Sequence, residues 1–359
     1  MKFRALAAFS FLLVASCSTS HQNDNLPINQ YQVIGSHNSY KQAIEPALMD
    51  SMIARDPRAT GLQYAHVSLA DQLDLGLRNL EIDVYADSLG GRYAHPEGLD
   101  WVKPEQPYDP DSLMMKPGFK VFHMIGVDFL SSCPTLKIAL VQLKAWSEAN
   151  PGHFPVFITM EVKGSADQMK DDHSKLTEPE RLTSATFDRL DEAIRAGLGD
   201  DKLITPDMVR ADYPTLNEAV TKGSWPKLED AQGRFLFILD DGGAKRDLYM
   251  HGHPSLIGRV LFARAEPGTP EAAALLLNDP ENPEIPKLVK QGYLIRTRAD
   301  ANTVEARNND YSRFETACAS GAQIITTDYY QPSTFFDSPY HIAFADSTYV
   351  RVNPLFEKR

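Results

Sequence analysis

From Tyr31 onward, short runs of hydrophobic and β-branched residues alternate with segments of helical periodicity. This alternation is typical of a parallel sheet whose strands are connected by helices. The sequence predicts eight strands, at residues 32–35, 78–85, 120–123, 155–162, 235–240, 259–263, 293–298 and 323–328. Eight strands in one α/β chain, with no linker dividing it, favour a single (β/α)8 TIM barrel over two doubly wound domains.

The clearest predicted helix begins after Pro134, because apolar residues recur at helical spacing from Leu136 to Trp146 until Asn150 and Pro151 end it. Further helices are predicted at 68–75, 179–196, 283–291 and 311–320. Two segments, 86–118 and the chain after 328, exceed ordinary loop length and are rich in aromatic residues. Both follow strands, so we expect them to form long loops with an aromatic rim at the C-terminal face of the barrel. The alternative is that these aromatics only pack the loops onto the barrel.

Composition and charge narrow the class of partner. Of 359 residues, 43% are hydrophobic and 23% are charged, which allows a large core. The 36 Lys and Arg residues face 48 Asp and Glu residues, giving a formal net charge of -12, and the basic residues do not cluster. Such a surface does not favour nucleic acid as a partner. We also expect a monomer.

The N-terminus has the layout of an export signal. Lys2 and Arg4 precede an apolar stretch, and the residues that end at Cys17 resemble a bacterial lipobox, in which this cysteine is acylated after cleavage. The sequence therefore predicts a signal peptide at 1–16, a lipidated linker at 17–30 and the catalytic domain at 31–359. The expected location is outside the cytoplasm, as a lipoprotein anchored on the periplasmic or cell-surface side, or as a secreted protein. An ordinary signal peptide with an incidental cysteine is the alternative.

The mature chain would keep Cys133 and Cys318. An oxidising compartment would permit a disulfide between them, provided that the fold brings them together.

Carboxylates occur on strand positions that point into the predicted barrel. Glu81 and Asp83 share one face of their strand because side chains alternate, and Glu161 repeats the pattern in the strand 155–162. Three acids at one barrel mouth repel each other and lose hydration unless a cation is present. Together with Asn38 at the end of the first strand they form an all-oxygen set. Oxygen ligands favour Ca²⁺, with Mg²⁺ as the second choice.

Basic residues are predicted at the same rim. His37 follows the first predicted strand and His123 ends the third. Two histidines beside a divalent cation are suited to acid/base catalysis of phosphoryl transfer. Lys163 and Arg298 are candidates for binding phosphate oxygens. Each histidine taken alone is more often structural, and an inward glutamate can pair with Arg296 or Arg298 without a metal. Three further acids that end strands are candidates for supporting contacts: Asp240, Asp241 and Asp328.

Four motifs, in this order, resemble those of phosphoinositide-specific phospholipases C, most closely the bacterial secreted, calcium-dependent branch. They are Gly-Ser-His-Asn-Ser-Tyr at 35–40, Leu-Glu-Ile-Asp-Val at 80–84, Phe-His at 122–123 and the segment 155–163, and the similarity continues at 296–300 and 321–328. The resemblance implies a (β/α)8 barrel with Ca²⁺ at its C-terminal face. It also implies cleavage of phosphatidylinositol to diacylglycerol and a cyclic or linear inositol phosphate.

The resemblance also implies roles for individual residues. By motif, the calcium ligands correspond to Asn38, Glu81, Asp83 and Glu161, and the catalytic histidines to His37 and His123. His123 is then the general acid, His37 stabilises the charge on the phosphorane, and a carboxylate such as Glu161 is a candidate base. Two other functions remain open: a glycerophosphodiester phosphodiesterase and a non-catalytic, lipid-tethered binding lipoprotein.

Overall fold

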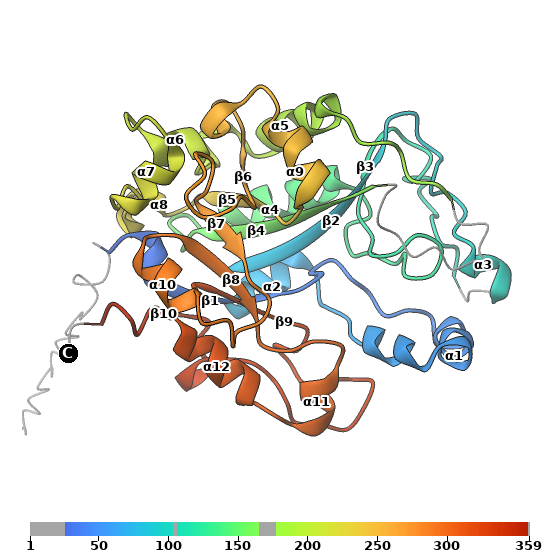
Figure 1. Ribbon diagram of the computed structural model, residues 1–359. Coiled ribbons are helices and arrows are strands. Elements are labelled where there is room, and N and C mark those ends of the chain that lie inside the picture. The colour runs from blue at the N-terminus through green and yellow to red at the C-terminus, as the bar shows by residue number, and fades with distance from the viewer. Residues whose placement is uncertain (1–25, 103–105, 165–176, 358–359) are drawn as a thin grey trace, which may run out of the picture.

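The computed structural model describes residues 26–102, 106–164 and 177–357, and its centre is a nearly closed barrel of eight parallel strands (Figure 1). Around the barrel the strand order is β6-β5-β4-β2-β1-β9-β8-β7, and a bridge between Arg264 and Ala274 joins the two end strands. The predicted (β/α)8 barrel is confirmed. The strands are β1 (Tyr31–Ser36), β2 (Asn79–Asp87), β4 (Val156–Lys163), β5 (Phe235–Leu239), β6 (Leu261–Ala263), β7 (Ala274–Leu276), β8 (Leu294–Arg298) and β9 (Ile324–Thr327).

Two short antiparallel strands extend the sheet outside the barrel. β3 (Gly118–Lys120) pairs with the end of β2, and β10 (Val350–Val352) pairs with the start of β1. The prediction of a barrel strand at 120–123 is therefore wrong, and His123 follows β3 in a loop rather than ending a barrel strand. The barrel strand that the sequence did not predict is β7, whose three residues are too few to show a pattern of their own.

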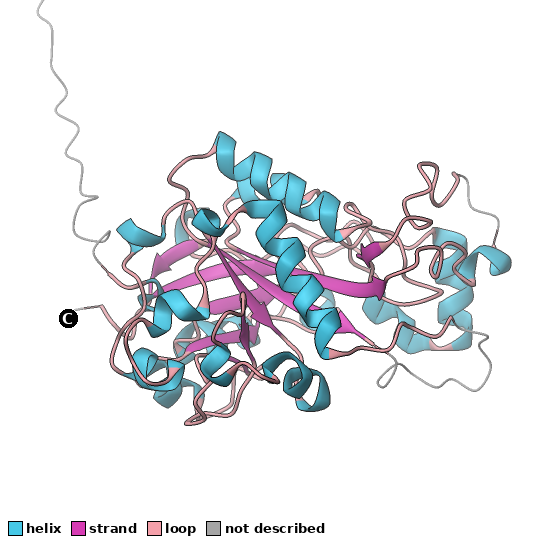
Figure 2. Ribbon diagram, turned by 90° about the horizontal axis from the view of Figure 1, so that it is seen from above, coloured by secondary structure: helices cyan, strands magenta, loops and turns pink. Residues whose placement is uncertain are grey.

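Helices cover the outside of the barrel (Figure 2). The five predicted helices are present as α2 (Leu69–Leu75), α4 (Leu136–Ala149), α5 (Ser184–Leu198), α10 (Ile285–Lys290) and α12 (Ser312–Ser320). The described residues also form helices that the sequence did not indicate: α1 (Pro46–Arg55), α3 (Gly98–Trp101), α6 (Pro206–Arg210), α7 (Leu216–Thr221), α8 (Leu228–Ala231), α9 (Gly243–Met250) and α11 (Val304–Asn308). Short 3-10 helices lie at Ile28–Gln30, Pro57–Leu62, Asp200–Lys202, Pro254–Leu256 and Ala345–Ser347.

The start and the buried face of α4 both follow from its sequence. The Thr135 side chain accepts a hydrogen bond from the backbone N–H of Ile138 and so caps the helix start. Leu140, Leu143 and Trp146 are buried on the side that faces the barrel. No helix in the described ranges is long and apolar enough to cross a membrane.

A close contact between β1 and β2 determines where the loop after β1 lies at the C-terminal face of the barrel. Gly35 is paired with Asn79, and a Cβ atom at Gly35 would lie 2.4 Å from the Cβ of Asn79. Only glycine fits this contact. The loop that follows β1 therefore lies directly beside the carboxylates of β2.

The long loops at the carboxyl ends of the strands are packed largely by their own aromatic side chains. Tyr93, Tyr329, Tyr330 and Tyr340 are all buried. For these residues the packing alternative holds, and they do not form an exposed aromatic rim. Cys133 is buried, and both Cys133 and Cys318 are free thiols in this structure.

Candidate active site

The loop after β1 is fastened to β2 by backbone and hydroxyl contacts. The Ser39 N–H donates to the carbonyl of Glu81 at 2.9 Å, and the Glu81 N–H donates to the Ser39 hydroxyl at 2.7 Å. Asn38 adopts the left-handed conformation, with φ of 49°. His37 and Asn38 are therefore held at the mouth next to Glu81.

His37 is fixed by an aspartate and an arginine from the last two strands. Its Nδ1 donates to Oδ1 of Asp328 at 2.7 Å, and Arg298 donates through Nη1 to its Nε2 at 3.2 Å. A guanidinium only donates, so Nε2 carries the lone pair and the ring is neutral. Burial, assisted by the positive charge of Arg298, lowers the pKa of His37 below its usual value. A second nitrogen of Arg298 donates to Oδ2 of Asp328 at 3.0 Å.

His123 has the same kind of support, although it lies in a loop. Its Nδ1 donates to Oδ2 of Asp128 at 2.8 Å, and Nζ of Lys41 lies 3.4 Å from the other oxygen of that carboxylate. Burial alone would raise the pKa of Asp128, but Lys41 and His123 outweigh it and hold the pKa below its usual value. Each histidine is thus oriented by a buried aspartate that a cation supports. No other described residue forms a hydrogen bond with Nε2 of His123, which leaves this nitrogen available for proton transfer.

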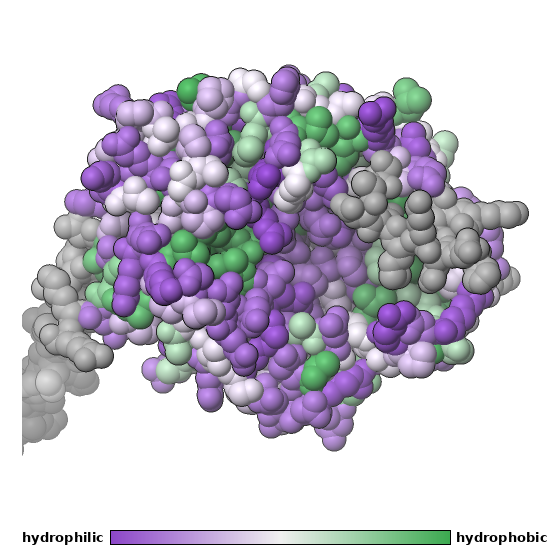
Figure 3. Space-filling view, in the orientation of Figure 1, coloured by the Kyte–Doolittle hydropathy of each residue, from purple (hydrophilic) through white to green (hydrophobic). Residues whose placement is uncertain are grey.

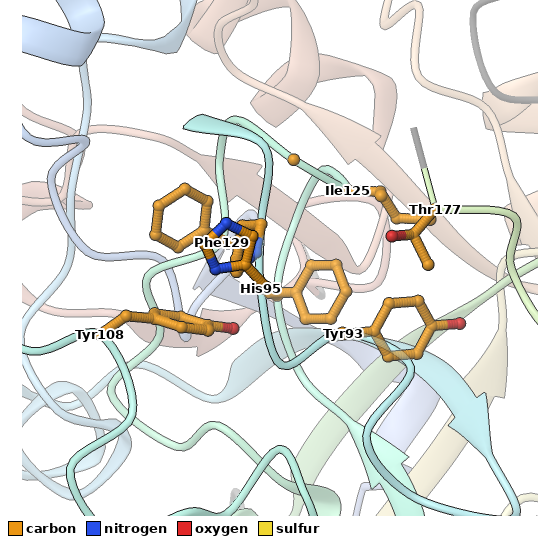
Figure 4. A pocket seen from close by; sticks show the side chains of 9 residues that line it. Tyr93, His95, Tyr108, Ile125, Phe129 and Thr177 are labelled. Carbon is orange, nitrogen blue, oxygen red and sulfur yellow. The ribbon is translucent and has the colours of Figure 1, made fainter. Parts of the chain in front are cut away.

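Aromatic packing holds the His123 loop in place. The Phe122 ring stacks on Tyr85 with centroids 4.2 Å apart, and the Tyr85 hydroxyl donates to the carbonyl of His123 at 3.0 Å. Beyond this contact, side chains that include Tyr93 and Phe129 line a small pocket (Figure 4). On the face shown in Figure 3, hydrophilic residues gather in a hollow beside the carboxyl ends of β2 and β4.

The three predicted carboxylates lie at the same mouth of the barrel, and each of them contacts a basic side chain. Arg296 donates to Glu81 in a buried ion pair, so the predicted alternative of an arginine partner holds for this glutamate. Asp83 and Glu161 are directly opposite each other on β2 and β4. Nζ of Lys163 lies 3.1 Å from Oδ2 of Asp83 and donates to Oε2 of Glu161 at 2.6 Å. The ammonium of Lys163 therefore bridges the two acids.

Asp83 is the least satisfied of these acids. Its side chain is fully buried, and neither carboxylate oxygen forms a hydrogen bond. Burial raises the pKa of Asp83 above its usual value; Lys163 opposes this shift, and the charges of Glu161 and Glu81 add to it. A buried carboxylate without hydrogen bonds is stabilised by a nearby cation.

The oxygen atoms at the mouth are the kind of ligand that a hard cation prefers, but the side chains are not already arranged around an ion position. In the described ranges, no three His, Cys, Asp or Glu side chains are arranged to hold a metal ion. Neither oxygen of Asp83 forms a hydrogen bond, although Lys163 lies 3.1 Å from one of them. Oδ1 of Asn38 accepts one 3.3 Å hydrogen bond from Tyr40. Glu161 is one-third exposed. A cation that contacts both Asp83 and Glu161 would have to displace the ammonium of Lys163 from between them.

The sequence analysis did not identify Asp128 or Lys41, and it proposed only a supporting role for Asp328. Asp128 lies five positions after His123, but a loop carries no periodicity from which that contact follows. Cys17 lies outside the described residues. The other predicted residues are all at the mouth: His37, His123, Asn38, Glu81, Asp83, Glu161, Lys163 and Arg298.

Comparisons with known proteins identify the family and a similar fold. Residues 26–354 match the model of a family described as phosphoinositide phospholipase C, Ca²⁺-dependent. The fold is similar to that of a calcium-dependent phosphoinositol-specific phospholipase C from Pseudomonas sp, a Gram-negative bacterium, with a TM-score of 0.55, 17% identity and coverage of 92% of this chain and 96% of that one. It is also similar to the Ca²⁺-dependent phosphatidylinositol-specific enzyme from Streptomyces antibioticus, with a TM-score of 0.54, 19% identity and coverage of 85% and 95%. No curated protein matches the sequence.

Proposed function

Because the chain belongs to the Ca²⁺-dependent phosphoinositide phospholipase C family, we propose that its mouth residues cleave phosphatidylinositol to diacylglycerol and an inositol phosphate. Membership confirms the predicted family and the predicted enzyme class, a phosphoric diester hydrolase or lyase. One observation supports this assignment most directly. Both histidines are oriented through Nδ1 by buried aspartates at the mouth that also contains Asn38, Glu81, Asp83 and Glu161.

We propose that Asn38, Glu81, Asp83 and Glu161 hold the Ca²⁺ ion. When bound, the ion would lower the pKa of the inositol 2-hydroxyl and neutralise phosphate charge. The oxygen-only donor set and the buried Asp83 support this proposal. Lys163, one-sixth exposed, is then free to contact a phosphate oxygen.

Both histidines donate through Nδ1 to an aspartate, so Nε2 is the nitrogen that exchanges a proton with the substrate in each of them. Nε2 of His37 carries a lone pair, so this histidine accepts the proton of the attacking inositol hydroxyl. As the new bond to phosphorus forms, the bond to the glycerol oxygen breaks. His123 acts here as the imidazolium: its Nδ1–H stays on Asp128, and its second proton passes from Nε2 to the leaving oxygen. Arg298 places its guanidinium beside Nε2 of His37 and stabilises the negative charge on phosphorus. This assignment moves the expected stabilising role from His37 to Arg298 and replaces a carboxylate base with His37.

Product analysis tests the function. Incubation with phosphatidylinositol vesicles and Ca²⁺ should yield a cyclic inositol phosphate, detected by phosphorus NMR, and chelation of Ca²⁺ should abolish it. Release of glycerol phosphate alone from phosphodiester substrates would support the glycerophosphodiester phosphodiesterase instead. Lack of product from a range of phosphodiesters, with vesicle binding retained, would support the binding lipoprotein.

We also propose that the protein is an exported, monomeric lipoprotein anchored through Cys17. The basic start, the apolar stretch and the small residues before Cys17 support this proposal. Expression of the full chain should place the activity in the membrane fraction, and Cys17→Ser should release it into the soluble fraction. An unchanged distribution in the variant would contradict anchoring at this cysteine.

A further inference from the structure

His66, which lies between the 3-10 helix Pro57–Leu62 and α2, contacts the backbone of the loop that carries the proposed catalytic residues. Its Nε2 lies 2.8 Å from the carbonyl oxygen of His37, 29 positions earlier in the chain. A carbonyl oxygen only accepts, so Nε2 is the protonated nitrogen and donates. This carbonyl belongs to the peptide between His37, the proposed proton acceptor, and Asn38, a proposed calcium ligand.

The His66 ring is held between aromatic side chains from separate parts of the chain. It stacks on Tyr330 with centroids 5.3 Å apart and an interplanar angle of 22°, and its centroid lies 5.7 Å from that of Tyr64. The hydroxyl of Tyr64 accepts a hydrogen bond from Nδ2 of Asn38 at 2.7 Å. Tyr330 follows Asp328, the partner of His37, by two positions. The ring is thus packed against both segments that orient His37 and Asn38.

The peptide that His66 contacts precedes a residue in a strained conformation. Asn38 has a φ of 49°, in the left-handed region that few non-glycine residues adopt. Contacts must compensate this strain for the loop to keep its shape. Backbone hydrogen bonds hold the neighbouring groups, from His37 N–H to the carbonyl of Thr327 and from Lys41 N–H to that of Asn38. The His37 carbonyl itself accepts from the His66 side chain.

We propose that His66 is a positioning residue, whose Nε2–H fixes the peptide between His37 and Asn38 and so sets the proton acceptor and the calcium ligand in one geometry. Burial lowers the pKa of His66 to about 4, so at neutral pH the ring keeps its single proton on the donating nitrogen. Its Nδ1 is buried without a hydrogen-bond partner among the described residues. The inference rests on the proposed function, because it assigns roles to His37 and Asn38.

Two substitutions distinguish the role of the His66 hydrogen-bond donor from that of its aromatic ring. His66→Phe keeps an aromatic ring against Tyr330 and removes the donor, whereas His66→Gln removes the ring and keeps an amide donor at similar reach. A cavity of about 230 Å³ beside His66 leaves room for either side chain. His251→Phe, at an exposed position, is the matched control.

The test combines three measurements on the full mature chain. Calorimetry gives the Ca²⁺ dissociation constant, steady-state kinetics give kcat, and amide hydrogen exchange without Ca²⁺ reports on the loop at residues 37–39. His66→Phe should weaken Ca²⁺ binding and lower kcat by about 10-fold each, the effect of losing one good hydrogen bond, and should speed exchange in that loop. His66→Gln should stay within about 3-fold of wild type in each measurement, and His251→Phe should match wild type.

The outcomes separate this inference from the proposed function. Unchanged loop exchange in His66→Phe would overturn the positioning role even if the enzyme is active. Equal losses in His66→Phe and His66→Gln would also overturn it, because the ring and not the donor would then matter. A wild-type protein that neither binds Ca²⁺ nor cleaves phosphatidylinositol would instead overturn the proposed function, and the exchange measurement would still report on the contact between His66 and His37.

Discussion

Nδ1 of His37 lies 2.7 Å from Oδ1 of Asp328, although the two residues are 291 positions apart in the chain. β1 and β9 are neighbours in the barrel, with Ser36 paired to Thr327, so each residue follows directly from a paired strand end. The tautomer of His37 therefore depends on the meeting of the first and last barrel strands. A substitution that removes Asp328 should therefore impair catalysis by His37 although it lies in the C-terminal segment.

Asp328→Asn should lower kcat by about 10²- to 10⁴-fold, because an amide no longer holds the His37 tautomer or the charge that balances Arg298. The measurement is the initial rate of phosphatidylinositol cleavage at saturating Ca²⁺, with the fold checked by circular dichroism. Asp337→Asn, at an exposed position in the same segment, is the control and should match wild type. A folded Asp328→Asn enzyme with nearly full activity would exclude Asp328 from orienting His37.

His123→Ala should lower kcat by about 10²-fold or more, because it removes the proposed proton donor for the glycerol oxygen. His95→Ala is the matched control. His95 also lies within 2.8 Å of an aspartate, Asp100, but this pair is about two-thirds exposed, so the substitution should leave the rate unchanged. Equal rates for both variants would remove His123 from the mechanism.

Arg296→Met should destabilise the Ca²⁺-free protein by about 3–5 kcal/mol, because it leaves the buried charge of Glu81 without its partner. Urea unfolding in the presence of a chelator measures the free energy. Lys287→Met is the control, since it breaks the exposed pair with Glu284 and should cost at most about 1 kcal/mol. Adding Glu81→Gln to Arg296→Met should recover part of the loss, and a double variant no more stable than Arg296→Met would show that the ion pair is not the cause.

Ca²⁺ binding should strengthen as the pH rises. Burial raises the pKa of Asp83 above its usual value in the metal-free protein, so a proton competes with the ion for this carboxylate. Lowering the pH adds this proton and weakens binding, and raising the pH removes it. Calorimetry at pH 6 and pH 8, in buffers of different ionisation enthalpy, should show tighter binding at pH 8 and proton release at pH 6. Binding without proton release at either pH would contradict the role of Asp83.

Much of the fold follows from local sequence patterns. β2 and β4 are long runs with regular alternation, so their strands and the inward direction of Glu81, Asp83 and Glu161 are predictable. The local pattern of an antiparallel strand does not differ from that of a parallel one, so the sequence alone does not show that β3 lies outside the barrel. β7 is short and lies within a uniformly apolar stretch, which carries no alternation.

The parts of the site that lie in loops could not be predicted in the same way. Asp128, Lys41 and His66 act through contacts that exist only after the barrel has formed and the loops have packed on it. No spacing rule connects His66 to the carbonyl of His37, because the intervening residues form α1 and a 3-10 helix. The sequence places Arg296 and Lys163 on strands, but it does not show which acid each of them contacts, because that depends on the side-chain conformations in the folded barrel.

If Asn38, Glu81, Asp83 and Glu161 hold one Ca²⁺ ion, a crystal structure determined in excess Ca²⁺ should show it. We expect an ion at about 2.3–2.6 Å from oxygens of these four residues, with Lys163 withdrawn from between Asp83 and Glu161. A structure in which Lys163 still bridges those two acids and Arg296 still holds Glu81, with no ion among them, would contradict the proposed site.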